Sequence, residues 1–183
     1  MVARFALMIL VVLVLSVPAG AREIAGIEVP EKVVQAGGKE LQLNGAGIRS
    51  KFFFKIYIAQ LYLEQTGNDV EKILAFDGGR RMIMHFLYDE VGKEDLIEAW
   101  NEGFEANGTA EQLKNCADRI QQFNDLFETV KEGDQVLLDY RPGAGTSVTI
   151  RGQEKGVIEG KDFNDLLLSI WLGKEPVTED LRD

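Results

Sequence analysis

The sequence predicts an α+β domain in which helices cover one side of a largely antiparallel sheet. Strand-like segments lie towards both ends of the chain, within residues 24–63 and 135–159, and two amphipathic helical segments lie between them, within residues 94–130. Three strands within residues 135–159 are separated only by tight turns, which is typical of an antiparallel meander. Grouping of strands and helices in this way favours α+β over an alternating α/β fold.

The first 21 residues predict a secretory signal peptide. Arg4 supplies a positive charge, residues 5–17 are apolar apart from Ser16, and the segment ends in an Ala-x-Ala pattern at Ala21. The apolar run is shorter than the roughly 20 residues that cross a bilayer, although an uncleaved anchor is the alternative. We expect cleavage after Ala21, one domain over residues 22–183, no stable membrane insertion afterwards, and a periplasmic or secreted location.

Short strands precede the longest one. Residues 24–29 and 39–43 alternate between apolar and polar side chains, which predicts two strands. Asn44 and the Gly-Ala-Gly that follows it predict a turn. Residues 51–63 contain many aromatic and β-branched side chains and neither Pro nor Gly, so they predict one long strand.

The two faces of this long strand differ in character, because successive side chains point to opposite sides. We expect one face to be core; it carries Phe52, Phe54, Ile56, Ile58 and Tyr62. The opposite face mixes cations, a phenol and apolar residues: Lys51, Phe53, Lys55, Tyr57, Ala59, Leu61 and Leu63. Such a face can hold an amphipathic anion, or it is a solvated surface.

The later elements follow from periodicity and capping residues. Asp69 predicts a short helix over residues 70–75, and residues 80–88 predict a strand. Apolar stripes predict helices over residues 94–107 and 110–130, and Thr109 with Gln112 forms the capping-box pattern of the second. A last helix over residues 163–172 is expected to be capped by Asp162, and the intervening meander strands lie at residues 135–140, 147–151 and 157–159.

Composition excludes several functional classes. The formal net charge of −10 is unfavourable for binding nucleic acid. One cysteine and one histidine provide neither an intramolecular disulfide nor a multi-histidine metal site, so we interpret Cys116 and His85 as structural. No dinucleotide or phosphate-loop pattern is present, so we expect neither metal nor cofactor.

After these exclusions, the candidate site is a cluster of cations and a phenol: Arg49, Lys51, Lys55 and Tyr57. It lies in a segment that resembles a known family. Residues 45–64, GAGIRSKFFFKIYIAQLYLE, are similar to the signature of bacterial chalcone isomerase-like proteins, exported relatives of plant chalcone–flavanone isomerase and of plant fatty-acid-binding proteins. The resemblance extends over residues 22–183. It implies an open-faced β-sandwich, a large antiparallel sheet with a helical layer.

The resemblance also implies site residues. Arg49 matches the arginine that stabilises an oxyanion in the isomerases and holds the ligand carboxylate in the fatty-acid binders, where a tyrosine matching Tyr57 assists it. An arginine fork suits a carboxylate because it offers two parallel charge-assisted hydrogen bonds. The remaining polar positions of the isomerases are not matched; they fall near Asp95, Glu102 and Ile170.

The spacing of the two matched residues sets a geometric condition. A straight strand would separate residues 49 and 57 by roughly 26 Å, too far to grip one carboxylate. A shared site needs a bend near Ser50; without it, Arg49 alone, or Lys55 with Tyr57, must hold the ligand.

Three functions are therefore open. The first is a binder of a small apolar carboxylate, such as a fatty acid, or of a phenolic ligand, through Arg49, Tyr57 and Lys55. The second is an intramolecular lyase with Arg49 and Tyr57 as catalytic residues. The third is a non-catalytic interaction module in which Arg49 pairs with an acid and no pocket reaches it.

Overall fold

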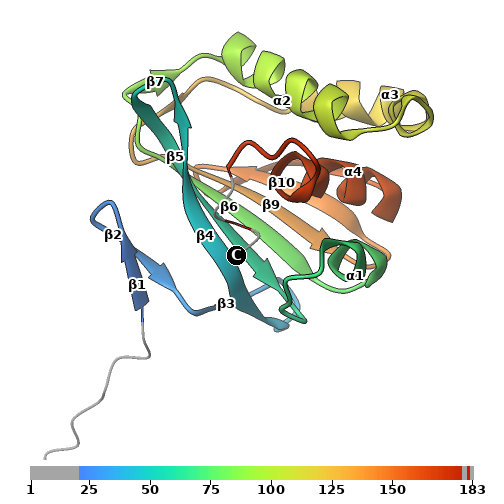
Figure 1. Ribbon diagram of the computed structural model, residues 1–183, viewed down its shortest axis with the longest axis horizontal. Helices are drawn as coiled ribbons and strands as arrows, with labels where there is room; N and C mark the ends of the chain where they lie inside the picture. Colours follow the sequence, from blue (N-terminus) through green and yellow to red (C-terminus); the bar gives the residue numbers. More distant parts are fainter. Residues whose placement is uncertain (1–20, 179–180, 182–183) are drawn as a thin grey trace, which may run out of the picture.

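The computed structural model describes residues 21–178 and 181, and its centre is a seven-stranded antiparallel sheet with helices on one face (Figure 1). The strands lie in the order β11-β10-β9-β6-β5-β4-β3. Their bounds are β3 (Lys32–Val34), β4 (Glu40–Lys51), β5 (Phe54–Leu63), β6 (Arg80–Phe86), β9 (Gln135–Arg141), β10 (Gly145–Ile150) and β11 (Gln153–Ile158). The predicted α+β class and the meander are confirmed.

Four helices are described: α1 (Val70–Ala75), α2 (Lys93–Asn107), α3 (Ala110–Asp125) and α4 (Lys161–Leu172). The side chains of Asp69 and Thr109 cap α1 and α3 as predicted, and Gln112 completes the capping box. Helix α3 ends at Asp125, before the predicted residue 130, because the chain turns to pair the short strands β7 (Glu90–Val91) and β8 (Val130–Lys131).

The predicted cap of the last helix is wrong. Helix α4 begins at Lys161 after Gly160, whose φ of 96° favours glycine, and no side chain caps it. Asp162 instead lies in the first turn, and its two carboxylate oxygens accept hydrogen bonds from Arg119 at 2.6 Å.

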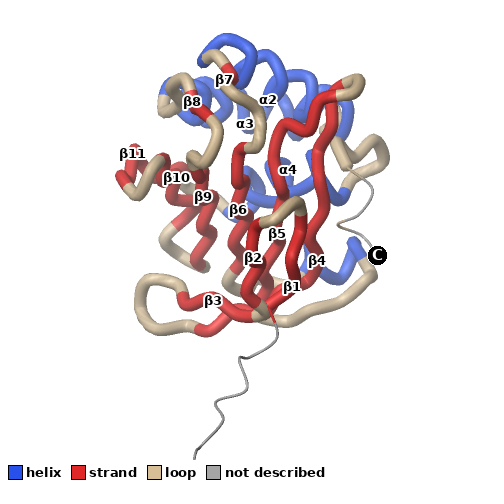
Figure 2. The backbone as a smooth tube through the Cα atoms, turned by 90° about the vertical axis from the view of Figure 1, so that its left-hand side faces the viewer, coloured by secondary structure: helices blue, strands red, loops and turns tan. Residues whose placement is uncertain are grey.

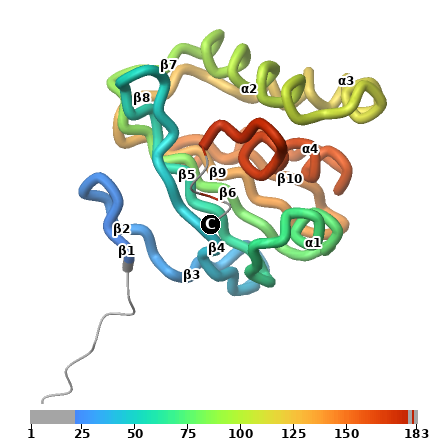
Figure 3. Tube along the Cα trace, viewed as in Figure 1, coloured from blue at the N-terminus to red at the C-terminus, as the bar shows by residue number. Residues whose placement is uncertain are grey.

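The main core lies between the sheet and the helices. Figure 3 shows α4 between α1 and the α2–α3 pair, over the sheet. Trp171 and Phe163 on α4 are fully buried, and Trp171 contacts Trp100 of α2 with 5.7 Å between ring centroids. Gly103 of α2 permits this close approach, because a Cβ there would lie 2.9 Å from Ile170.

A smaller core lies on the other face of the sheet. The hairpin β1 (Ala21–Ile24) and β2 (Ile27–Pro30) covers β4 and β5 there (Figure 2) and buries Val29 against Ala46 and Ile58. The sequence predicted a single strand over residues 24–29. The structure instead turns at Ala25 and Gly26, which both have positive φ.

The predicted turn at residues 44–47 is also wrong, and the predicted core face of the long strand is confirmed only at Ile58 and Tyr62. Residues 44–47 lie inside β4, and the chain turns at residues 52–53 to enter β5. Phe52 and Phe54 are exposed, whereas Ile58 and Tyr62 lie under the small hairpin. The main core takes the opposite face of β5: Tyr57, Ala59, Leu61 and Leu63.

The signal peptide expected at residues 1–21 lies outside the described residues except for Ala21. Among the helices that are described, none has the length and apolar character needed to span a bilayer.

Candidate functional site

The β4–β5 hairpin brings Arg49 and Tyr57 together. The turn at residues 52–53 provides the bend that a shared site requires, and Arg49 becomes the cross-strand partner of Tyr57. The guanidinium carbon lies 5.6 Å from the centroid of the Tyr57 ring, within the range of a cation–π contact. Residues eight apart in sequence are therefore neighbours across two strands.

A β-bulge beside this pair decides which side chains face inwards. Arg49 pairs with Tyr57 and Ser50 with Lys55, so Ile56 is an extra residue without a cross-strand partner. Ile56 and Tyr57 both line the same pocket, and Lys55 is exposed and does not line it. The structure thus joins two of the three expected ligand residues and places Lys55 outside; Lys51 lines the pocket instead.

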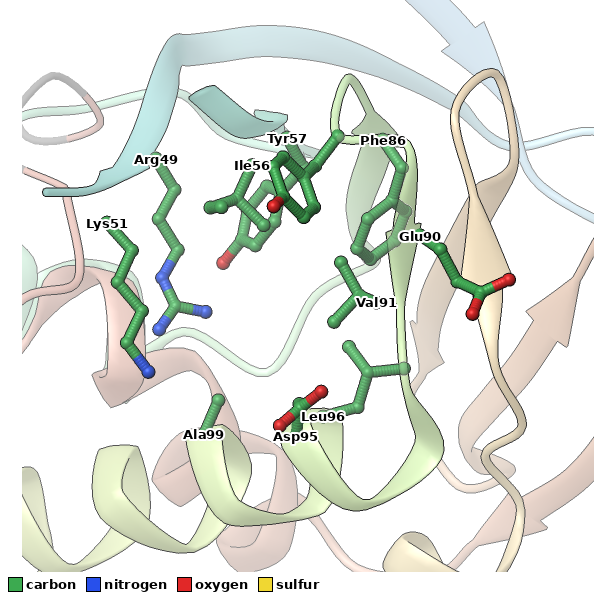
Figure 4. Close-up of a pocket in the computed structure, with 11 residues that line it drawn as sticks. Arg49, Lys51, Ile56, Tyr57, Phe86, Glu90, Val91, Asp95, Leu96 and Ala99 are labelled. Carbon is green, nitrogen blue, oxygen red and sulfur yellow. The ribbon is translucent and has the colours of Figure 1, made fainter. Parts of the chain in front are cut away.

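The pocket lies between the ends of β4–β6 and the first turns of α2, and its volume is about 150 Å³ (Figure 4). Arg49 and Lys51 extend from β4 towards α2, and Asp95 and Ala99 face them from the helix. The lining residues are Arg49, Lys51, Ile56, Tyr57, Phe86, Tyr88, Glu90, Val91, Asp95, Leu96 and Ala99. The site therefore combines an apolar wall with cations at one side.

Arg49 is half-buried, yet it forms no ion pair with any residue that the structure describes. Of the two carboxylates in the lining, Glu90 points away and pairs with Lys131 at 3.2 Å. Asp95 lies in the first turn of α2, where the helix dipole stabilises a negative charge. No acid in the described part of the chain thus neutralises the guanidinium, which can pair with an anion in the pocket.

Tyr57 is a buried, neutral hydrogen-bonding group. Only 1% of the residue is exposed, and its hydroxyl oxygen accepts a hydrogen bond from Trp171 Nε1 at 3.2 Å. Burial raises the pKa of Tyr57 above its usual 10.0, and the nearby Arg49 charge opposes this only in part. The phenol therefore keeps its proton at neutral pH and can donate it to an acceptor in the pocket.

Sequence reasoning missed several residues of this site. Phe86 ends β6 and Leu96 belongs to the predicted apolar stripe of α2, and the sequence named neither as a pocket residue. The sequence contains no signal for the hydrogen bond from Trp171, because the two partners are more than a hundred residues apart. At the unmatched isomerase positions, Asp95 lines the pocket, whereas Glu102 and Ile170 do not.

Comparison with known proteins agrees with this architecture. Residues 21–183 match the family described as chalcone isomerase-like. The crystal structure of a fatty-acid binding protein of Arabidopsis thaliana is similar, with a TM-score of 0.64 and 17% sequence identity, over 83% of this chain and 94% of that one. No curated protein matches the sequence. The structural similarity confirms the expected fold, a curled antiparallel sheet with a layer of helices.

Proposed function

Because the chain belongs to the chalcone isomerase-like family, we propose that it binds a small apolar carboxylate in this pocket. The observation that supports the proposal best is an arginine that pairs with none of the described acids, beside a buried, neutral tyrosine at the side of an apolar pocket. The similar plant protein is named as a fatty-acid binder, which agrees with this class of ligand.

The head group would be held by complementary donors. Arg49 would offer a carboxylate two charge-assisted hydrogen bonds, and the Tyr57 hydroxyl would donate a third. Lys51 would add positive charge from the same strand. The interaction module considered from sequence is not favoured, because it required Arg49 to pair with an acid and to lie away from any pocket.

The size of the pocket limits the ligand. Its volume of about 150 Å³ is about half of the smallest volume typical of small-molecule sites, roughly 300 Å³. Ile56, Val91 and Leu96 form an apolar wall, so a short or medium acyl chain or a compact phenolic acid fits better than a long fatty acid. We propose that binding takes place in the periplasm or outside the cell, as the signal-like N-terminal sequence indicates.

Isothermal titration with octanoate and octanol tests the role of the head group. We expect octanoate to bind more tightly than octanol, because only the carboxylate pairs with Arg49. The substitution Arg49→Gln should weaken octanoate binding roughly 10- to 100-fold and leave octanol binding nearly unchanged. Lys55→Gln is the matched control, since it removes a charge from the same hairpin outside the pocket.

Two results would contradict the proposal: equal affinity for octanoate and octanol, or equal losses from Arg49→Gln and Lys55→Gln. Native mass spectrometry of protein purified from its own cell, beside Arg49→Gln, addresses the natural ligand. We expect a carboxylate to accompany the wild-type protein and to be lost from the variant.

A second candidate is an intramolecular lyase, and one observation favours it. Asp95 lies in the same pocket as Arg49 and Tyr57, so a carboxylate base faces a site that can stabilise an oxyanion. If the protein catalyses ring closure, Asp95→Asn should abolish turnover of a hydroxychalcone, followed by its absorbance, and retain binding. No turnover by the wild-type protein would exclude this substrate class.

A further inference from the structure

The turn of the β4–β5 hairpin exposes three consecutive phenylalanines beside the pocket. Phe52 is 86% exposed, Phe53 99% and Phe54 56%, and we call these three residues the aromatic tip. Soluble domains seldom expose adjoining large apolar side chains without an interaction that covers them. The tip plays no part in binding the carboxylate, because none of its residues lines the pocket.

The tip is convex and lies at the outer edge of the molecule. Figure 2 shows the turn of this hairpin at the edge of the structure, next to α2. A two-residue turn presents its side chains outwards and forms no groove. Such a shape suits insertion into a soft surface better than packing against a rigid protein partner.

The charges around the tip favour one kind of surface. Lys51 and Lys55 flank it, and neither forms an ion pair with a residue that the structure describes. The segment from Ser50 to Lys55 contains no acid, although the whole chain has a formal net charge of −10. Phenylalanine flanked by lysine is typical of segments that lie at the boundary between lipid head groups and acyl chains.

The backbone of the turn gives independent support. Phe52 has a φ of 56°, a conformation that glycine and asparagine adopt readily and that is unusual for a bulky residue. The turn thus keeps an exposed aromatic side chain where a smaller residue would suit the backbone better. Strain of this kind points to a function for the side chain.

We infer that the aromatic tip docks on the surface of a lipid bilayer that contains anionic lipid. Phe52 and Phe53 enter the head-group boundary, and Lys55, which lies outside the pocket, remains at the level of the phosphates. Acids on the neighbouring helix, Glu94, Asp95 and Glu98, are exposed and repel the same surface. The molecule therefore contacts the anionic membrane through the aromatic tip and not through α2.

Docking in this orientation brings the pocket close to the membrane. Tyr88 lines the pocket and also contacts the tip, with 5.5 Å between the ring centroids of Tyr88 and Phe54. An amphipathic ligand would then enter from the bilayer. This consequence rests on the proposed function, whereas docking itself does not depend on what the pocket binds.

The test places a fluorescent reporter on the tip. In the full chain, Phe53→Trp adds an indole to an exposed site, while the natural Trp100 and Trp171 are buried. The protein is mixed with vesicles of equal parts phosphatidylcholine and phosphatidylglycerol, with and without brominated acyl chains. We expect the indole at position 53 to be quenched by bromine, and high salt to weaken the effect.

Val157→Trp is the matched control. Val157 is an exposed apolar residue on β11, at the opposite edge of the sheet from β4, so an indole there should escape quenching. Because both variants share the same N-terminal segment, binding through that segment affects them alike. Equal quenching at positions 53 and 157, or none at position 53, would overturn the proposal.

A second variant separates docking from ligand binding and from self-association. Phe53→Ser should lower vesicle partitioning about tenfold and leave octanoate affinity unchanged. A loss of octanoate binding without a loss of partitioning would contradict the proposal. So would a change in sedimentation mass without any vesicle binding, since the tip would then contact a second copy of the chain.

Discussion

Two arginines of the same sheet, Arg49 on β4 and Arg80 on β6, illustrate how the surroundings of a side chain decide its role. Arg80 is 3% exposed and its guanidinium is surrounded by acceptors. These acceptors are Asn164 Oδ1, Asp165 Oδ1 and the carbonyl oxygens of Ile73, Leu74 and Phe76, at 2.6–3.0 Å. Arg49 has a tyrosine ring beside it and forms no ion pair with a described acid. The first arginine ties α1 and α4 to the sheet, and the second is available to a ligand.

We therefore predict that the two substitutions change the free energy of unfolding by very different amounts. Arg80→Met should lower the free energy of unfolding by about 3–5 kcal/mol, because it leaves Asn164 Oδ1 and the carbonyls of Ile73 and Phe76 without this donor, although Asp165 keeps its ion pair with Lys161. Arg49→Gln should lower it by only about 1–2 kcal/mol, the value of a partly buried cation–π contact. Urea denaturation followed by circular dichroism measures both. A large loss from Arg49→Gln would show that this residue is structural.

The raised pKa of Tyr57 predicts how stability depends on pH. The folded state keeps the phenolic proton above the usual pKa of 10.0, whereas the unfolded state loses it there. The unfolded state is thus favoured increasingly above pH 10.0, so this stability is present below that pH and is lost as the pH rises. The same direction holds for Tyr62, whose pKa burial raises to about 12.

Tyr57→Phe should make the alkaline loss of thermal stability less steep. At neutral pH it should cost about 1–3 kcal/mol, since the buried Trp171 indole would lose its acceptor. Thermal midpoints measured from neutral pH to above 10.0 test both effects. Tyr88→Phe, at a partly exposed ring, is the control; an equal change in its alkaline slope would argue against the assignment to Tyr57.

Individual site residues could be predicted from the sequence only in part. Arg49 and Tyr57 were found through the resemblance, and their placement in one pocket needed a turn that the sequence did not indicate. Lys55 was grouped with Tyr57 because strict alternation puts residues 55 and 57 on one face. The bulge at Ile56 breaks that alternation, and a bulge leaves no reliable mark in a single sequence.

Among the elements, the β4–β5 hairpin contains both the proposed ligand-binding pair, Arg49 and Tyr57, and a residue with an unfavourable backbone conformation, Phe52. If Phe52 is held at positive φ by the geometry of the turn, Phe52→Gly should raise the free energy of unfolding by about 1 kcal/mol. Phe53→Gly is the control, because φ at Phe53 is not positive and the flexible residue brings no relief there. Urea denaturation compares the two, and equal effects would show that the turn is not strained.

Elements were predicted well where local chemistry decides them. The stripes of α2 and α3 and the caps at Asp69 and Thr109 appear in the structure because capping and amphipathicity act within one or two turns. The hairpin was misplaced because Asn44-Gly45 has the composition of a turn, whereas Phe52-Phe53 does not. Gly45 instead leaves room for the backbone of Leu181, since a Cβ there would lie 3.1 Å from the carbonyl oxygen of Leu181.

Across the whole molecule, the two faces of the sheet are covered unequally. The helices bury one face in a large aromatic core, whereas the β1–β2 hairpin covers only β4 and β5 on the other. Among the described residues, neither strand of this hairpin pairs with a strand of the seven-stranded sheet. Its described anchors are the small cluster around Val29 and a hydrogen bond from the Tyr62 hydroxyl to the Pro30 carbonyl at 2.9 Å. Alternation alone could not reveal which face of β5 receives the helices, since both faces are buried.

This asymmetry predicts that the molecule opens first at the small hairpin. Few apolar contacts hold β1 and β2, so their amides should exchange with solvent at a much lower opening free energy than those of β5, β6 and β9. Hydrogen exchange under native conditions, resolved by mass spectrometry, measures both. Tyr62→Phe should accelerate exchange in β2 further, because it removes the bond to Pro30, and should leave β9 unchanged. If β1 and β2 exchanged as slowly as β6, the hairpin would be an integral part of the cooperative core, and the fold would be closed on both faces.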